Sequence, residues 1–369
     1  MKKLVLFTLI LFLSVAFMFA GGAKETKPAA EAKPAAEAKP EAAKPAAEKI
    51  LIGMATDVGG LGDKSFNDGA YQGILKGQKE KGIEPRVVES KQMTDYVPNL
   101  TGLAEDGSKL VFAVGFLMAE AIMEAAKNNP NTYFAGIDIF IDPSSAPKNV
   151  VGILYKEHES GYLAGVVAGL LTKDYYKASP RLNDKNVVGM VLGMDIPPVE
   201  RFQAGFYAGV KAVNPTCEVL SVVTGSFTDQ AKGKEAAIAM IDKGADIIFQ
   251  IAGLTGLGAI NAAQEKGVCA IGVDVDQYAV APDTVITSAV KGIVNSVFLT
   301  IGDALGGTFK GGTSREFGIN EDSTGIAPFH NFDSVIPQAV KDKVNQTISD
   351  MKAGKIKIPA TRAEAGYKG

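Results

Sequence analysis

The chain has 369 residues, of which 46% are hydrophobic and 21% charged, as expected for a folded globular protein with more than one domain. A net charge of −3 without a basic stripe argues against a nucleic-acid partner. With two cysteines, two histidines and no tryptophan, the composition offers few ligands for a metal centre.

The N-terminus, residues 1–23, has the pattern of a secretory signal peptide. Lys2 and Lys3 precede an uncharged apolar run at 4–20, and small residues follow it. The alternative is an uncleaved membrane anchor, because a run of this length comes close to the ~20 residues of a spanning helix. No cysteine lies near the end of the run, so a lipid-modified cysteine is not expected.

Residues 24–48 are predicted to be a linker. Lys-Pro occurs four times in this alanine- and glutamate-rich stretch. Proline removes helical hydrogen bonds, and alanine with alternating charges has no apolar surface to bury, so a semi-stiff spacer is expected. Such a spacer would hold the following domain away from a surface. The alternative is a passive tail.

From residue 49 onward, short β-rich runs alternate with helical stretches. The first half has predicted strands at 50–55, 86–89, 110–114, 133–137 and 150–154, and helices at 66–81, 95–105, 118–128 and 159–172. The second half has predicted strands at 187–192, 218–223, 246–250, 268–273 and 285–288, and helices at 198–213, 230–243, 255–266 and 291–306. This alternation predicts two α/β domains, each a parallel sheet with helices on both faces.

One predicted helix carries a stripe of small residues. Gly161, Gly165 and Gly169 recur every fourth position, with alanines beside them. Because glycine has no side chain, we expect this helix to pack close to a sheet.

Equivalent residues follow equivalent strands in the two halves. A glycine follows each third strand, at Gly115 and Gly253, and an aspartate follows each fourth strand, at Asp138 and Asp274. Asp57 follows the first strand. Since ligands of open parallel sheets bind at the carboxyl ends of the strands, these residues predict a cleft between two domains.

The glycine-rich stretch TDVGGLGDKSFNDGAYQG follows the first strand and precedes a helix, as a phosphate-binding loop does. It matches neither G-x-x-x-x-G-K-[ST] nor G-x-G-x-x-G, and Asp57 and Asp63 would repel phosphate. We expect Asp63 or Ser65 to cap the helix. Phe66 and Asn67 would then lie in its first turn, near the cleft.

The sequence offers little for catalysis or metal binding. His158 and His330 have no nearby partner with the spacing of metal ligands. Cys217 and Cys269 lie at the second and fourth strands of the second half. In a 2-1-3-4-5 strand order two other strands separate them, so two buried free thiols are expected rather than a disulfide. There is no G-x-S-x-G nucleophile elbow.

Phe66 and Phe227 each stand at a strand-to-helix turn, one in each half. Aromatic rings stack on flat rings, and carboxylates accept hydrogen bonds from hydroxyls such as those of a ribose. The two phenylalanines could clamp a ring between the domains. The alternative for each is an ordinary place in the core.

Four stretches identify a family resemblance: DVGGLGDKSFNDGAYQG, YKEHESGYLAGVVAG, GSFTDQAKGKEAA and GVDVDQ. They resemble the basic membrane protein family, which comprises substrate-binding components of ABC importers and includes purine nucleoside receptors. The match runs in order from about residue 50 to 359.

The resemblance implies a type I periplasmic-binding-protein fold. In this fold two doubly wound parallel-sheet α/β domains are joined by a multi-strand hinge and close on the ligand. The expected boundaries are 49–155 plus 289–312 for the N-terminal domain and 156–288 plus 313–369 for the C-terminal domain.

By motif position, the resemblance also implies eight ligand-binding residues. Phe66 and Phe227 would stack on a purine base. The others would hydrogen-bond to the ligand: Asp57, Asn67 and Asp138 to the base, and Gly253, Asp274 and Lys291 to the ribose. The match at Lys291 depends only on the weaker pattern TSAVKGIVNSV.

These implications describe a non-enzymatic receptor for adenosine, guanosine or inosine that delivers its ligand to an ABC permease. A monomer without metal or cofactor is expected. Many family members carry an N-terminal lipid-modified cysteine, whereas this chain has Ala20-Gly21-Gly22 there. The protein would therefore be released outside the cytoplasmic membrane or held there by an uncleaved N-terminal segment. The same fold could instead bind riboflavin or a simple sugar, and a nucleoside-processing enzyme is the alternative of another class.

Overall fold

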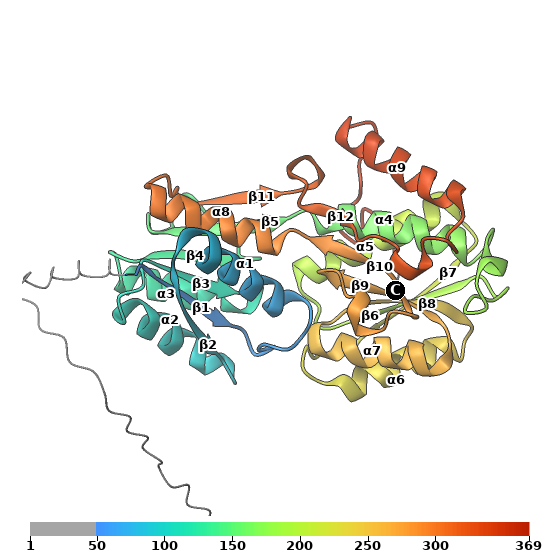
Figure 1. Cartoon of the computed structure of the whole chain (residues 1–369), viewed down its shortest axis with the longest axis horizontal. Helices are drawn as coiled ribbons and strands as arrows, with labels where there is room; N and C mark the ends of the chain where they lie inside the picture. Colours follow the sequence, from blue (N-terminus) through green and yellow to red (C-terminus); the bar gives the residue numbers. More distant parts are fainter. Residues whose placement is uncertain (1–48, 369) are drawn as a thin grey trace, which may run out of the picture. The chain divides into compact units, whose positions relative to one another are not determined.

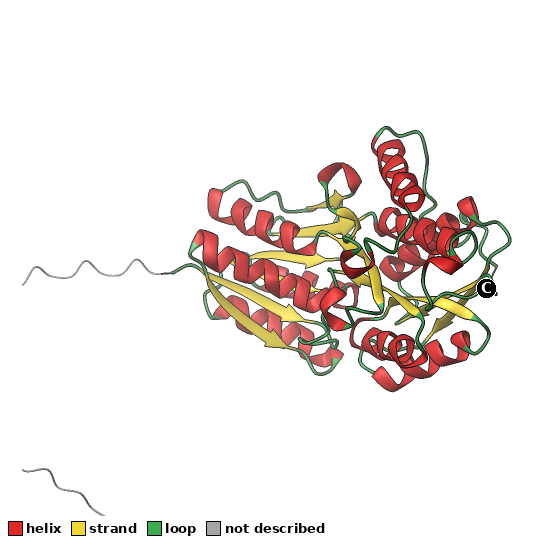
Figure 2. Ribbon diagram, turned by 45° about the vertical axis from the view of Figure 1, so that its right-hand side comes forward, coloured by secondary structure: helices red, strands yellow, loops and turns green. Residues whose placement is uncertain are grey.

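The computed structural model describes residues 49–368, so the predicted signal segment and linker lie outside the described residues. Within this range the chain forms two six-stranded sheets with helices on both faces of each (Figures 1 and 2). No helix in residues 49–368 is both long enough and apolar enough to cross a bilayer.

The first sheet and its helices form what we call lobe 1. The sheet is parallel, in the order β11-β5-β4-β3-β1-β2. Its strands are β1 (Leu51–Thr56), β2 (Glu84–Glu89), β3 (Leu110–Val114), β4 (Tyr133–Ile137), β5 (Val150–Tyr155) and β11 (Thr313–Phe317). Its helices are α1 (Phe66–Lys81), α2 (Tyr96–Glu105), α3 (Ala119–Asn128) and α8 (Ile293–Gly306). One face packs under α1 and α8, and the other under α2 and α3.

The second sheet and its helices form lobe 2. The order is β12-β10-β9-β8-β6-β7, and only the edge strand β12 is antiparallel to its neighbour. Its strands are β6 (Val187–Leu192), β7 (Glu218–Val223), β8 (Ala245–Ile251), β9 (Cys269–Asp274), β10 (Val285–Lys291) and β12 (Thr324–Ile326). Its helices are α4 (Glu157–Leu171), α5 (Pro197–Val213) and α9 (Gln338–Lys352) on one face, and α6 (Gln230–Ile241) and α7 (Gly253–Lys266) on the other.

Local sequence explains these elements. The central strands β6 and β8 are buried at every residue. Burial on both faces favours continuous apolar runs over alternating ones, and only Asp246 and Gln250 of β8 depart from this pattern. Three helices end at a glycine in the left-handed region, namely Gly82, Gly267 and Gly307. Glycine adopts this conformation without the steric cost that a side chain adds.

The predicted elements of both halves are present, with ends shifted by at most three residues. The predicted 2-1-3-4-5 strand order is confirmed in each sheet. The short strands β11 and β12 and the helix α9 were not predicted.

Strand pairing differs from the predicted domain boundaries at two places. β11 pairs with β5 of the first sheet, although residues 313–369 were predicted to belong to the second domain. The last three residues of β10 pair with β9 and β12, although residues 289–312 were predicted to belong to the first domain. Sequence periodicity marks a strand but does not say which sheet edge accepts it.

Three connections join the lobes: from β5 to α4, from β10 to α8 and from β11 to β12. Their backbones are hydrogen-bonded to one another. Lys156 N donates to Phe317 O at 2.9 Å, and Gly292 N donates to Ser323 O at 2.7 Å. The hinge is therefore one bonded unit of three chain segments rather than a set of independent linkers.

The glycine stripe of α4 faces α5 and not a sheet, so the expected partner was wrong. At Gly161 and Gly165, an added Cβ atom would overlap backbone atoms of α5. Gly205 and Gly209 of α5 stand in the same relation to the backbone of α4. Glycines on both helices thus allow the backbones of α4 and α5 to contact each other directly. Packing of a helix on a sheet does not require such a close approach.

Cys217 and Cys269 are both buried and free, as predicted. Burial raises the pKa of each thiol to about 12. Both thiols are therefore protonated and poorly reactive in the folded protein.

Candidate ligand-binding cleft

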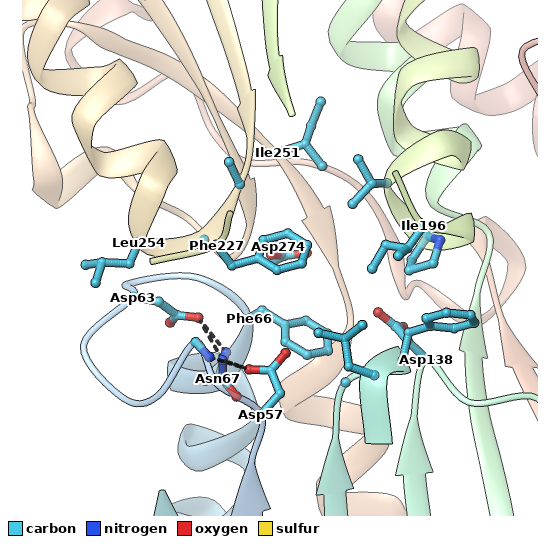
Figure 3. A pocket seen from close by; sticks show the side chains of 18 of the residues that line it. Asp57, Asp63, Phe66, Asn67, Asp138, Ile196, Phe227, Ile251, Leu254 and Asp274 are labelled. Carbon is cyan, nitrogen blue, oxygen red and sulfur yellow. Dashed lines mark hydrogen bonds between the residues drawn. The ribbon is translucent and has the colours of Figure 1, made fainter. Parts of the chain in front are cut away.

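A cavity lies between the lobes, at the carboxyl ends of the strands (Figure 3). Every residue predicted to bind ligand lines it: Asp57, Phe66, Asn67, Asp138, Phe227, Gly253, Asp274 and Lys291.

The loop after β1 places Asp57 and Asn67 side by side. Asp57 Oδ1 accepts hydrogen bonds from Gly59 N at 2.9 Å and from Asn67 Nδ2 at 3.1 Å. Gly115, at φ +122°, leaves room for the carboxylate, because a Cβ atom there would lie 2.7 Å from Asp57 Oδ2. Asn67 Oδ1 is buried and has no hydrogen-bond partner within residues 49–368.

Asp63 caps α1. Its carboxylate accepts hydrogen bonds from the backbone N–H groups of Ser65 at 3.0 Å, Asn67 at 2.8 Å and Asp68 at 3.1 Å. Of the two expected caps, Asp63 is therefore the one that caps the helix. The Ser65 side chain instead points across the cleft, where its Oγ donates to Asp274 Oδ2 at 2.6 Å.

Phe66 and Phe227 approach the cavity from different lobes (Figure 3). Each ring is partly buried and also packs against the core of its own lobe. The clamping of a ring between them stays a prediction. Two backbone hydrogen bonds hold the loop that carries Phe227 in place. Ser226 N donates to Gly193 O at 3.2 Å, and Thr255 N donates to Phe227 O at 3.1 Å. An added Cβ atom at Gly193 would overlap the Phe227 ring, which therefore rests against backbone.

Asp138 and Asp274 occupy equivalent positions in the two lobes. Each stands at the carboxyl end of the fourth strand of its half, and each has φ +64°, which is uncommon for a residue with a side chain. Asp138 Oδ2 accepts from Lys291 Nζ at 2.6 Å, while the buried Oδ1 has no partner among the residues described.

Lys291 is the one cation on the described cavity wall. Its Nζ lies 5.0 Å from the centroid of the Phe66 ring and 4.9 Å from that of Tyr155. Burial lowers the pKa of Lys291, but Asp138 and Glu157 outweigh that effect and raise it above its ordinary value. The side chain is therefore an ammonium ion.

Acidic groups outnumber Lys291 on this wall. Burial raises the pKa of Asp57 to about 6 and that of Asp274 to about 7, and neither has a cation within hydrogen-bond reach. Four aspartates line the cavity with one lysine. Such a wall suits an uncharged ligand that donates N–H and O–H hydrogen bonds.

Sequence reasoning missed much of the apolar wall. Part of it follows β3, as Gly115 does, and part follows β6 or β8. These residues are Phe116, Leu117, Ile196, Pro198, Val199, Phe202, Ile251, Ala252 and Leu254. Their position just after predicted strands could have indicated a place in the cleft. Residue type alone, however, does not distinguish an apolar residue that lines a cavity from one that lies in the core.

His158 lies outside this cavity, near the hinge, and His330 bonds to Asp276 at 2.6 Å on the surface of lobe 2. Within the part of the chain that the structure describes, no three His, Cys, Asp or Glu side chains gather as a metal site would require.

The family model described as "Bmp: ABC transporter substrate-binding protein PnrA-like" matches residues 50–362. The CD4+ T-cell-stimulating antigen of Listeria monocytogenes is 33% identical over 335 residues, covering 85% of this chain and 89% of that protein. The ABC transporter nucleoside-binding protein BmpA of Lactococcus lactis is 32% identical over 329 residues, covering 83% and 88%.

Among solved structures, an ABC transporter solute-binding protein from Aeropyrum pernix K1 superposes with a TM-score of 0.75. Its sequence is 26% identical, and the match covers 86% of this chain and 95% of that one. The two-lobed architecture is therefore that of ABC transporter solute-binding proteins.

Proposed function

The chain belongs to the Bmp family of PnrA-like ABC transporter substrate-binding proteins, and on that basis we propose that it binds purine nucleosides in the interlobe cavity. The observation that carries this proposal is the pair Phe66 and Phe227. One ring from each lobe borders a single cavity whose remaining polar groups are almost all acceptors.

The phenylalanines would stack on the purine. Each aromatic contact of this kind contributes about 0.5–1.5 kcal/mol beyond the apolar area that it buries. A base held between the lobes would touch both of them at once, so ligand binding would favour the closed arrangement.

The base would be read by three polar side chains. Asn67 Oδ1 and Asp138 Oδ1 are buried without partners, and an unpaired buried acceptor costs about 1–3 kcal/mol. Ligand N–H groups would remove that cost. Asp57 stands next to Asn67 and could accept a further N–H hydrogen bond.

The ribose would lie toward lobe 2. Asp274 would accept from its hydroxyls, Lys291 would donate to it, and the backbone at Gly253 would border it. The membrane partner would be an ABC permease that receives the nucleoside when the lobes open. No catalytic role is proposed for any residue.

Calorimetric titration tests the proposal. The protein is unfolded and refolded to remove bound ligand, and adenosine, guanosine, inosine, ribose and riboflavin are added separately. Tight binding of nucleosides without binding of ribose is the expected result. Binding of ribose or riboflavin alone would keep the fold and overturn the assignment of the site. Release of adenine from adenosine during the titration would show an enzyme instead.

A further inference from the structure

Glu157 is a buried charge that the cavity itself does not explain. It is the first residue of α4, its side chain is fully buried, and it is not part of the cavity wall. A buried carboxylate is costly unless its oxygens are paired. Both are paired here: Oε1 lies 3.0 Å from Lys291 Nζ, and Oε2 accepts a hydrogen bond from Arg201 Nε.

These contacts place Lys291 between two carboxylates of different origin. Asp138 comes from lobe 1, at 2.6 Å, and Glu157 begins the first helix of lobe 2, at 3.0 Å. Because an ammonium has three N–H donors, two of them are directed at these partners and one remains for the cavity. Glu157 therefore helps to decide where the third donor points.

The same contacts set the charge of this part of the wall. Burial raises the pKa of Asp138, and its contact with Lys291 opposes that effect. With both carboxylates ionised, Asp138 and Glu157 are balanced by Lys291 and Arg201, and the four groups together are neutral. Lys291 is thus already compensated and offers no net positive charge to an anionic ligand. Burial raises the pKa of Glu157, but Lys291 and Arg201 outweigh that effect and hold it below its ordinary value, so Glu157 is ionised at neutral pH.

We propose that Glu157 is a positioning and specificity-determining residue: it holds Lys291, with the support of Arg201, so that the cavity accepts uncharged ligands and rejects anionic ones. This inference rests on the proposed function, since it requires the ligand to lie against Lys291. Glu157 acts through Lys291 and does not touch the ligand.

Glu157→Gln tests this proposal with two probes, adenosine and adenosine 5′-carboxylate, which differ chiefly in the negative charge. The variant should bind adenosine about tenfold more weakly, because Lys291 loses one of the partners that position it. Its discrimination against the carboxylate should fall by at least about tenfold, because Asp138, Lys291 and Arg201 together then carry one uncompensated positive charge. A variant that is merely less stable would lose affinity for both probes in proportion.

Asp246→Asn is the matched control. Asp246 is a buried carboxylate near the amino end of β8, at the opposite edge of the sheet from the cavity, and it bonds to Asn183 N. Its removal should leave the ratio of the two affinities unchanged. A second variant, Glu157→Gln with Arg201→Gln, removes the pair together and covers the case in which the single variant fails to fold. The remaining pair of Asp138 and Lys291 is again neutral, so the affinity for adenosine should fall while the ratio of the two affinities stays near that of wild type.

An unchanged ratio in Glu157→Gln, or an unchanged affinity for adenosine in the double variant where the single one does not fold, would overturn the role of Glu157 and leave the nucleoside site standing. Failure of the wild-type protein to bind adenosine or any other nucleoside would overturn the proposed function and this inference with it.

Discussion

At the scale of single residues, the cavity keeps several carboxylates under conditions that disfavour their charge. Asp57 has a pKa raised to about 6 by burial, and its two hydrogen-bond donors only partly offset that effect. In the ligand-free protein the ionised form of Asp57, which predominates at neutral pH, is therefore less stable than an exposed carboxylate would be. Carboxylates in this state gain most when a ligand supplies the missing donors.

Asp57→Asn should stabilise the ligand-free protein in a pH-dependent way. The folded-state pKa lies above the unfolded value of 3.8, so the folded protein binds more protons between pH 4 and 6 and loses stability as the pH rises. The variant has no carboxyl group at this position, so its stability does not fall in this way. Its gain in unfolding free energy relative to wild type should grow by about 2 kcal/mol from pH 4 to pH 7.5. Urea titrations at both values measure it, and an equal difference at both would contradict it.

Phe66→Ala and Phe227→Ala should each weaken nucleoside binding by at least about tenfold, because each removes one stacking contact and its buried area. Calorimetry measures the affinity, and circular dichroism checks that the fold survives. Phe140→Ala is a suitable control, because Phe140 is exposed and lies outside the cavity wall. Unchanged affinity in both cleft variants would contradict stacking.

At the scale of elements, the α4–α5 contact depends on glycine. Each helix presents glycines to the backbone of the other. The same helices carry Glu157 and Arg201 and bring Pro198, Val199 and Phe202 to the cavity. Their spacing therefore affects the shape of the site as well as stability.

Gly165→Ala should lower the free energy of unfolding by about 3 kcal/mol, because the added methyl group would overlap backbone of α5, which cannot yield as a side chain can. Gly102→Ala is the matched control: it lies in α2, and an added Cβ atom there meets nothing within 4 Å. Alanine at Gly102 should stabilise by about 0.5–1 kcal/mol. Thermal or urea unfolding measures the stability of both variants. A Gly165→Ala variant as stable as wild type would contradict the packing explanation.

Sequence periodicity was sufficient for the first five strands of each half and for the helices between them. It missed β11 and β12, which have five and three residues and lie at sheet edges, and it also missed the 15-residue helix α9 that follows them. In the cleft, Asp57, Asp138 and Asp274 could be found because acidic residues after strand ends are conspicuous. Glu157 could not, because its importance depends on Lys291, which is distant in sequence and is reached only through the fold.

At the scale of the whole molecule, ligand should protect both lobes from unfolding. Cys217 and Cys269 are buried in lobe 2, and both thiols have a pKa raised to about 12, so neither should react with an aromatic disulfide reagent until the protein unfolds. A nucleoside at one hundred times its Kd should slow the reaction about 100-fold where unfolding limits it. In denaturant without reductant, two thiols should be titrated. Fast labelling of the native protein, or fewer than two thiols after unfolding, would contradict this prediction.

The three connections between the lobes also impose an order in time on folding. When a ribosome has made β1 to β5, the face of the first sheet beside Ile74 still lacks α8, and the sheet still lacks its edge strand β11. The chain next makes almost all of lobe 2. At ~5–20 residues per second, this takes roughly ten to thirty seconds. Lobe 1 therefore remains incomplete, with an apolar face exposed, until α8 has been synthesised after most of lobe 2. During that interval it stays soluble only if it aggregates slowly or if a chaperone covers the same face.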